Sequence, residues 1–224
     1  MTTQLYFAPG ACSFVPHVLL EAAGAAFEPT LVKLHKGEQR GDAYLAINPR
    51  GQVPVLVEGD AVITQILAIV TYLHERFPQM QYLPGDPLAK ARVLQTLAWM
   101  NNTVHPTFTH IFMPQKFTDN AALQGDLKRF NTTLFAQQLA EIEAMAQRAL
   151  GAGAPGQGGY LGGTHLGPLD AYALTLLRWG SIVGLDPAQF PTVWAHVQKL
   201  AALPAVARVI ARERLQLNLY PAAA

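Results

Sequence analysis

The stretch Asn48-Pro49-Arg50-Gly51-Gln52-Val53-Pro54, followed by the apolar run Val55-Leu56-Val57, is the most constrained part of this 224-residue chain. Its two prolines restrict the residues before them to extended conformations, and its glycine allows a turn that other residues rarely adopt. A proline that leads into a strand is a candidate for a cis peptide bond, found in about 5% of X-Pro bonds. The turn can leave the backbone of Val53 unpaired, and unpaired extended backbone can bind a peptide. The alternative is a loop that merely starts a strand.

The composition bounds the function. Hydrophobic residues make up 50% of the chain and charged residues 14%, which indicates a folded protein with a large core. The net charge of +1 comes without a basic block or acidic tail, so we expect no nucleic acid and no membrane surface as a partner. A single cysteine excludes an internal disulfide and suits a reducing compartment. Because the N-terminal residues lack a signal-peptide pattern, we expect a cytoplasmic protein.

Residues 1–78 alternate between strand and helix patterns and predict a small α/β domain of order βαβαββα with a mixed sheet. A Gly59-Asp60 turn joins the last two strands, and Thr64 is the expected cap of the helix after them. The expected strands cover 4–7, 27–34, 55–57 and 61–63, and the expected helices cover 11–23, a short stretch before Pro49, and 65–77.

A proline-rich linker over 79–87 separates this domain from residues 88–224, in which only helical patterns occur. Asp86-Pro87 is a good cap and first-turn pair for the first of these helices. The segment 151–163 is glycine-rich but lacks the residues of a phosphate-binding loop, so we expect a mobile connection there. The expected helices cover 88–117, 121–150, 169–183, 192–202 and 205–213.

Cys12 is the first candidate for chemistry, because it follows a strand and a turn at the start of a helix. Free N–H groups and the helix dipole lower the pKa of a thiol in that position. The alternative is that Cys12 is a small buried hydrophobic residue. Ser13 is either a helix cap or a second donor beside the thiol.

His105 lies among aromatic residues in the long helical stretch, directly before Pro106. A proline inside a helix removes a hydrogen bond, so we expect an irregularity there. His105 is either a satisfied structural residue or a catalytic one. The seven histidines lack metal-ligand spacing, and we expect no metal site.

Gln65 and Ile66 open a helix directly after the predicted hairpin. Free N–H groups at a helix start can bind an anion, and the Gln65 amide adds a donor that can orient a carboxylate. The alternative is an ordinary helix start.

Together these features resemble the glutathione transferases, in particular the bacterial group with a cysteine after the first strand. The resemblance spans nearly the whole chain in order and implies a thioredoxin-like N-terminal domain, an all-helical C-terminal domain, and a homodimer that binds glutathione between its domains. The matching stretches are Pro9-Gly10-Ala11-Cys12-Ser13, the 48–54 stretch, Ala68-Ile69, Tyr72-Leu73, His105, Asp170-Ala171-Tyr172 and Leu177-Arg178-Trp179.

The resemblance also implies roles for individual residues. Cys12, with Ser13, faces the glutathione sulfur, and His105 is its polar neighbour. The backbone of Val53, before a cis Pro54, pairs with the cysteinyl part. The other implied contacts are Gln65 and the N–H of Ile66 with the γ-glutamyl carboxylate, His35 and Lys36 near the glycyl carboxylate, Gln52 in the same loop, and Asp170 as a buried acid that starts its helix.

Three positions depart from the family pattern. Ile66 stands where a serine is usual, so a charge-assisted hydrogen bond of roughly 1.5 to 3 kcal/mol is missing. Thr103 stands where the bacterial group tends to have an acid, and Gly167 replaces the usual Ser/Thr cap. We therefore expect weakened glutathione binding.

The predicted function is conjugation of the glutathione thiolate to a small, largely apolar electrophile, with thiol–disulfide exchange through Cys12 as an added activity. One alternative is a non-catalytic binding or regulatory protein of this fold. Another is a glutathione-dependent lyase or dehalogenase, which the sequence does not separate from a transferase. The expected co-substrate pocket is lined by Phe14, Phe108, Phe112, Met113 and Trp179.

Overall fold

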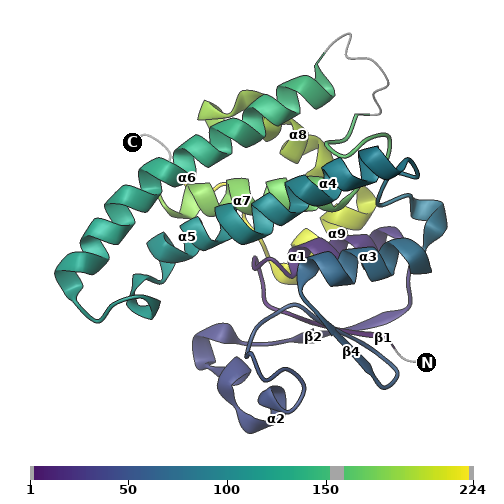
Figure 1. Ribbon diagram of the computed structural model, residues 1–224, viewed down its shortest axis with the longest axis horizontal. Helices are drawn as coiled ribbons and strands as arrows, with labels where there is room; N and C mark the ends of the chain where they lie inside the picture. Colours follow the sequence, from purple (N-terminus) through teal and green to yellow (C-terminus); the bar gives the residue numbers. More distant parts are fainter. Residues whose placement is uncertain (1–2, 152–158, 222–224) are drawn as a thin grey trace.

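The computed structural model describes residues 3–151 and 159–221. A four-stranded sheet forms its N-terminal part (Figure 1), with strand order β2-β1-β3-β4. The pair β1–β2 is parallel, and the pairs β1–β3 and β3–β4 are antiparallel, which confirms the mixed sheet. The strands are β1 (Thr3–Phe7), β2 (Phe27–Leu31), β3 (Val55–Glu58) and β4 (Ala61–Thr64).

Helices α1 (Phe14–Ala22) and α3 (Ile66–Arg76) cover the sheet face that is turned toward the helical part of the chain, whereas the short α2 (Asp42–Leu45) lies on the other side of the sheet (Figure 1). Two 3-10 turns, Leu34–Lys36 and Glu38–Arg40, precede α2. The order βαβαββα and the thioredoxin-like arrangement are as predicted.

The remaining chain is helical and forms one continuous core with α1. Helix α7 is the centre of this part, and Tyr172 within it is fully buried. The elements are α4 (Pro87–Trp99), a π-helix (Met100–Val104), α5 (His105–Phe112), a 3-10 turn (Pro114–Lys116), α6 (Ala121–Leu150), α7 (Pro168–Ile182), a 3-10 turn (Pro187–Gln189), α8 (Pro191–Ala201) and α9 (Pro204–Glu213).

The helix expected over 88–117 is wrong as one unit, because a π-helical segment divides it. Pro106 has no N–H to donate, and the His105 N–H bonds to Met100 O, five residues back. The irregularity expected at Pro106 is therefore confirmed. Asp86 caps α4 as expected, with Oδ1 accepting from Ala89 N at 2.8 Å.

The expected Thr64 cap is wrong. Thr64 is the last residue of β4, paired with Val55, and Gln65 occupies the N-cap position of α3. Between the two parts of the chain, Pro78–Met80 forms a 3-10 turn in the stretch expected as a linker. Most of the glycine-rich segment 151–163 lies outside the described residues. Within the described ranges, no helix is both long and apolar enough to cross a bilayer.

Candidate functional site

The sheet brings the predicted site segments together at one end of its strands. Tyr6 near the end of β1 pairs with Val55 at the start of β3, and Val55 also pairs with Thr64 at the end of β4. Cys12 follows β1, the Val53-Pro54 loop precedes β3, and Gln65 follows β4. Segments far apart in the sequence therefore converge beside the end of the central strand.

The loop over 48–54 is held by hydrogen bonds that converge on one carbonyl group. The Asn48 side chain, itself buried, donates from Nδ2 to Gln52 O at 2.8 Å, and the Tyr44 hydroxyl donates to the same oxygen at 2.7 Å. Gly51 has a φ of 60°, and a Cβ there would lie 2.7 Å from Gln39 O. The glycine is thus required for both conformation and space, as the sequence predicted.

Val53 leaves this loop with a free backbone donor. The Val53-Pro54 bond is cis, as expected. The Val53 N–H makes no hydrogen bond within the described part of the chain, and its C=O accepts only a weak bond from the Cys12 thiol, with Sγ at 3.6 Å. An extended peptide can therefore pair with Val53 without breaking a backbone bond.

Gln65 has an unusual backbone, with φ 71° and ψ 130°, values that residues other than glycine rarely adopt. Its C=O accepts from Ile69 N, so it starts α3 without a capping side chain. The Ile66 side chain is buried, which leaves only its N–H for a ligand. Local strain beside free N–H groups is typical of a binding site.

Cys12 is buried, and its Sγ lies against Val53 O. Burial raises the pKa of the Cys12 thiol to about 12, although the N–H groups of Cys12 and Ser13 act in the opposite direction. The lowered pKa expected from the helix position is therefore wrong for this structure. A neutral thiol is a hydrogen-bond donor, not a ready nucleophile.

Ser13 is fully buried and does not face a ligand. Its hydroxyl accepts from Ala8 N at 3.1 Å and donates to Ala8 O at 3.2 Å, which closes the turn between β1 and α1. It makes no capping bond to α1. Both expected roles, a helix cap and a donor beside the sulfur, are therefore wrong. The Ser13 hydroxyl instead stabilises the turn between β1 and α1.

His105 lies near the Cys12 turn, as two chains of contacts show. Its ring packs edge-on against Trp179, with centroids 4.7 Å apart, and the Trp179 Nε1 donates to Gly10 O at 2.8 Å. Its Nδ1 lies 2.9 Å from the hydroxyl of Tyr172, and the pKa of Tyr172 is raised by burial first and then by its proximity to Cys12. Burial, with a smaller contribution from Lys116, lowers the pKa of His105 to about 4. The imidazole is therefore neutral at physiological pH.

The Tyr172 hydroxyl also fixes which nitrogen of His105 carries the proton. It donates to Asn101 Oδ1 at 3.2 Å, so it accepts from His105 Nδ1–H. Nε2 then carries the lone pair, and it makes no hydrogen bond within the described ranges. The π-helix contributes to this arrangement, because Asn101 lies within it and His105 directly after it.

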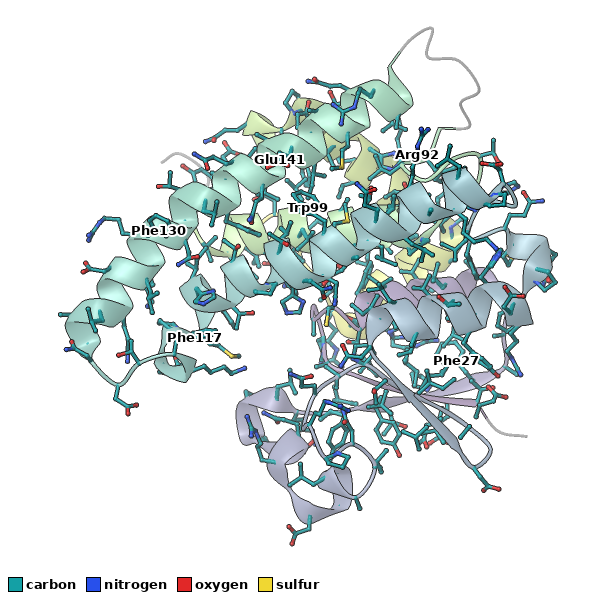
Figure 2. All side chains as sticks on the ribbon, viewed as in Figure 1. Phe27, Arg92, Trp99, Phe117, Phe130 and Glu141 are labelled. Carbon is teal, nitrogen blue, oxygen red and sulfur yellow. The ribbon has the colours of Figure 1, made fainter. Side chains whose placement is uncertain are left out.

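Three of the five residues predicted for the co-substrate pocket form an aromatic stack. Trp179 and Phe108 are stacked with centroids 4.4 Å apart, and Phe108 and Phe112 are stacked at 5.2 Å. Phe112 is 51% exposed, so the stack runs from beside Gly10 to the surface. Met113 follows directly in sequence. Figure 2 shows Phe117 in the turn after α5, on the side of the N-terminal domain.

Phe14 does not belong to that stack. It is the first residue of α1, and the packing of α1 among α3, α7 and α9 buries its ring in the main core. Its predicted role in the pocket is wrong, because the first turn of α1 faces inward.

His35 and Lys36 lie in the 3-10 turn that follows β2, and both are exposed. Since β2 is parallel to β1, this turn starts from the same end of the sheet as the Cys12 turn. The structure gives neither side chain a hydrogen bond to another predicted site residue, so their role stays a prediction.

Asp170 is the buried acid expected at the start of α7. It accepts from Gly167 N at 2.9 Å, Leu161 N at 2.9 Å and His196 Nε2 at 2.7 Å. Among the described residues, no group of three or more His, Cys, Asp and Glu side chains is placed to hold a metal ion.

Sequence reasoning missed three supporting residues. Tyr44 acts on Gln52, which no local motif connects to it. Tyr172 lies in a matching stretch, but its partner His105 is 67 positions away, so its role was hidden. Glu213, which accepts from Gly10 N, was equally hidden, since 203 positions separate the two.

The fold and site define a class: a thioredoxin-like domain with an unpaired backbone N–H at Val53, followed by a helical part that shares a core with it. Residues 1–75 match the family model described as the N-terminal domain of glutathione S-transferase. The chain is 30% identical over 201 residues to glutathione S-transferase GST-4.5 of Xanthomonas campestris pv. campestris, covering 89% of this chain and 93% of that protein.

Solved structures agree with this classification. A glutathione transferase homolog from Sulfitobacter with bound glutathione has a TM-score of 0.85 and 26% identity, covering 96% of this chain and 99% of that one. The beta-class glutathione S-transferase of Sphingomonas chungbukensis has a TM-score of 0.79 and 26% identity, covering 95% and 100%. This chain belongs to the glutathione S-transferase family, and its similarity is to bacterial transferases that include the beta class.

Proposed function

We propose that this transferase conjugates the thiolate of glutathione to small, largely apolar electrophiles. The observation that carries the proposal is the unpaired N–H of Val53 beside the Cys12 thiol, at the sheet edge where α3 also begins. An extended tripeptide fits this arrangement with its central residue on Val53, its γ-glutamyl carboxylate on the start of α3 and its sulfur beside Cys12.

Cys12 supports the sulfur as a donor in this proposal. A glutathione thiolate accepts a hydrogen bond from N–H groups of the turn and from the neutral Cys12 thiol, whose single S–H turns to it from the weak bond to Val53 O, and both bonds lower the pKa of glutathione. The glutathione proton leaves to solvent, because the pKa of His105, about 4, is too low for its Nε2 to hold that proton. His105 stays a neutral polar neighbour of the sulfur. The electron pair stays on sulfur, which then forms the bond to the electrophile as the leaving group departs.

The burial of Cys12 favours conjugation over thiol–disulfide exchange. Exchange requires the Cys12 thiolate to attack a disulfide, and the raised pKa of Cys12 leaves little thiolate near neutral pH. Exchange through Cys12 therefore stays the second activity of the proposal, to be measured beside conjugation.

Two measurements test the proposal. Calorimetric titration with glutathione should give saturable heat, and a chlorodinitrobenzene assay should give a glutathione-dependent rate. Val53→Pro, which removes the free N–H, should abolish both, whereas Val53→Ala, which changes the side chain and keeps the N–H, should retain both. A folded protein without heat at millimolar glutathione would instead be the non-catalytic binding protein. Assays with haloalkanes and aryl ethers distinguish a dehalogenase or lyase.

We also propose that the protein is a homodimer, with α6 in the contact. Phe130 is 70% exposed and borders a shallow surface hollow lined by Arg129, Phe130, Thr133, Leu134 and Gln137. Figure 2 shows Phe130 on the outer side of α6, and a large exposed aromatic ring there is a candidate for a contact with a second chain. Light scattering should give twice the chain mass, and Phe130→Asp should lower it while Lys128→Asp on the same helix should not.

A further inference from the structure

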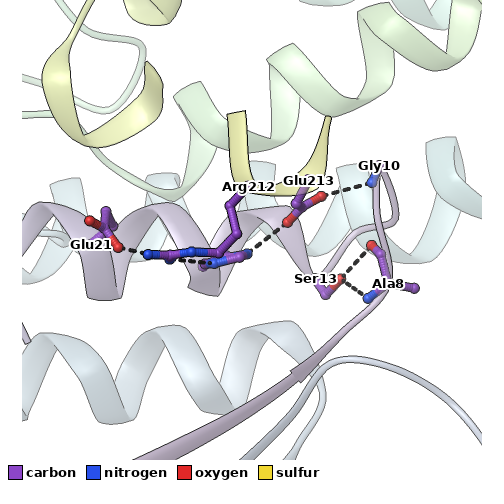
Figure 3. Close-up of polar contacts among 7 residues, drawn as sticks. Ala8, Gly10, Ser13, Glu21, Arg212 and Glu213 are labelled. Atoms are coloured by element: carbon purple, nitrogen blue, oxygen red, sulfur yellow. Dashed lines mark hydrogen bonds and ion pairs between the residues drawn. The ribbon is translucent and has the colours of Figure 1, made fainter. Parts of the chain in front are cut away.

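The last turn of α9 is joined to the turn that carries Cys12. The Glu213 side chain is fully buried, and its Oε2 accepts from Gly10 N at 2.8 Å (Figure 3). Its Oε1 lies 2.7 Å from Nδ1 of His17, which is also fully buried. A carboxylate near the end of the chain thus holds a backbone N–H two residues before Cys12.

The partners of His17 define its protonation. Arg212 Nη1 lies 3.1 Å from His17 Nε2, and an arginine side chain only donates hydrogen bonds. Nε2 therefore carries the lone pair, and Nδ1–H donates to Glu213.

The network continues outward from this pair. Arg212 Nη1 also donates to Glu21 Oε2 at 3.0 Å, and Arg208 Nε donates to Glu21 Oε1 at 2.6 Å. The side chain of Arg208 is 55% exposed, whereas the inner pair is enclosed. Removing the outer contact therefore leaves the inner one intact, which provides a matched control.

Gly10 is held on its other side as well. The Trp179 indole donates to Gly10 O at 2.8 Å, so α7 and α9 both bind this one residue. Gly10 has a φ of 67°, and a Cβ there would lie 2.6 Å from Arg178 Nη1. Helices α7 and α9 thus fix the backbone of Gly10, two residues before Cys12.

We propose that Glu213, oriented by His17, is a positioning residue for the sulfur site. By anchoring Gly10 N–H it sets the N–H groups of Cys12 and Ser13 that face Sγ, and it keeps Cys12 against Val53 O. The expected effect of Glu213 on kcat rests on the proposed conjugation, whereas its expected effect on the reactivity of the Cys12 thiol does not.

Cys12 is a specific reporter, because it is the single cysteine of the chain. Its alkylation by iodoacetamide, followed by mass spectrometry of the intact protein, measures how firmly the turn is held. Glu213→Gln removes the charge and leaves one acceptor oxygen for two buried donors, Gly10 N–H and His17 Nδ1–H, so the link from His17 through residue 213 to Gly10 is broken. We expect alkylation to be faster by about tenfold to a hundredfold. Arg208→Gln should keep the wild-type rate.

Kinetics then separate positioning from a purely structural role. Per folded enzyme, Glu213→Gln should lower kcat about tenfold, whereas KM for glutathione should stay within about twofold, because the contacts of Val53 and Gln65 do not involve Gly10. An alkylation rate equal to that of Arg208→Gln would overturn the proposal, even if Glu213→Gln melts at a lower temperature. Faster alkylation in an enzyme that fails to conjugate would uphold the positioning role and reject the proposed function.

A second variant covers the case in which Glu213→Gln does not fold. Arg212→Gln leaves the Glu213 carboxylate in place and removes the donor to His17 Nε2, and its side chain is already 38% exposed. We expect alkylation of Cys12 to be faster by about threefold to tenfold, a smaller change in the same direction. An unchanged rate in this variant would also count against the proposal.

Discussion

The Nδ1 atom of His105 lies 2.9 Å from the hydroxyl oxygen of Tyr172, and the same hydroxyl donates to Asn101. A residue that borders the sulfur site is thus oriented by a buried tyrosine from another helix. Because Asn101 only accepts in this bond, the direction of both hydrogen bonds is fixed, and the lone pair of His105 is on Nε2.

Removing this hydroxyl should reduce catalysis without unfolding the protein. Tyr172→Phe keeps the buried ring but frees the imidazole to rotate and to move its proton. We expect kcat/KM to fall about tenfold to a hundredfold, the loss seen when outer partners of other functional histidines are removed. Tyr160→Phe, which removes a hydroxyl from a ring next to His196, is the control. A Tyr172→Phe enzyme with the full rate would show that the tyrosine only fills space.

His105 should also make stability depend on pH. Its folded pKa, about 4, is below the ordinary value of 6.5, because burial disfavours the charged ring. Below pH 6.5, His105 is therefore protonated in the unfolded chain but still neutral in the folded protein. The free energy of unfolding falls as the pH drops from 6.5 toward 4. Between pH 7.5 and 5, the titration of His105 should lower the free energy of unfolding by about 2 kcal/mol. Urea unfolding at both pH values measures it.

The matched variant for that experiment is His105→Gln, which has a polar side chain but no titration in this range. Its unfolding free energy should lose about 2 kcal/mol less than the wild type over the same interval. Equal losses in the two proteins would mean that His105 titrates normally, and the pH dependence would then come from other groups.

The sequence predicted the element order βαβαββα, made Val53-Pro54 a candidate for a cis bond and placed an irregularity at Pro106, because each follows from local sequence patterns and backbone chemistry. It failed at Cys12, where the position at a helix start indicated a lowered pKa but burial by distant residues decided the opposite. It failed at Phe14 for the same reason, and at Ser13 because the hydroxyl bonds to the backbone of Ala8, five positions back. Which way a side chain faces depends on what packs over it, and here that is the helical domain.

The Tyr44 hydroxyl should affect glutathione binding through the loop that presents Val53. It donates to Gln52 O at 2.7 Å, together with Asn48. Tyr44→Phe removes one of these two bonds, and a loss of about 1 kcal/mol corresponds to roughly fivefold weaker binding of glutathione in calorimetry. Tyr6→Phe changes the ring that packs edge-on against Tyr44 and should leave the affinity unchanged. If Tyr44→Phe bound glutathione as tightly as Tyr6→Phe, the hydrogen bond from Tyr44 to Gln52 O would have no role in binding.

Gln65 offers a test in which stability and binding change in opposite directions. With φ at 71° and ψ at 130°, its backbone is strained for any residue with a Cβ. Gln65→Ala keeps the strain and loses the amide, whereas Gln65→Gly loses both. Both variants should bind glutathione about tenfold to a hundredfold more weakly, because a charge-assisted bond to the γ-glutamyl carboxylate is gone. Only Gln65→Gly should gain stability, unfolding with about 1 kcal/mol more free energy than Gln65→Ala. If the glycine variant were no more stable than the alanine variant, the strain would not be real. If both bound glutathione as tightly as the wild type, the amide would not contact the ligand, and the start of α3 would hold the carboxylate through its N–H groups alone.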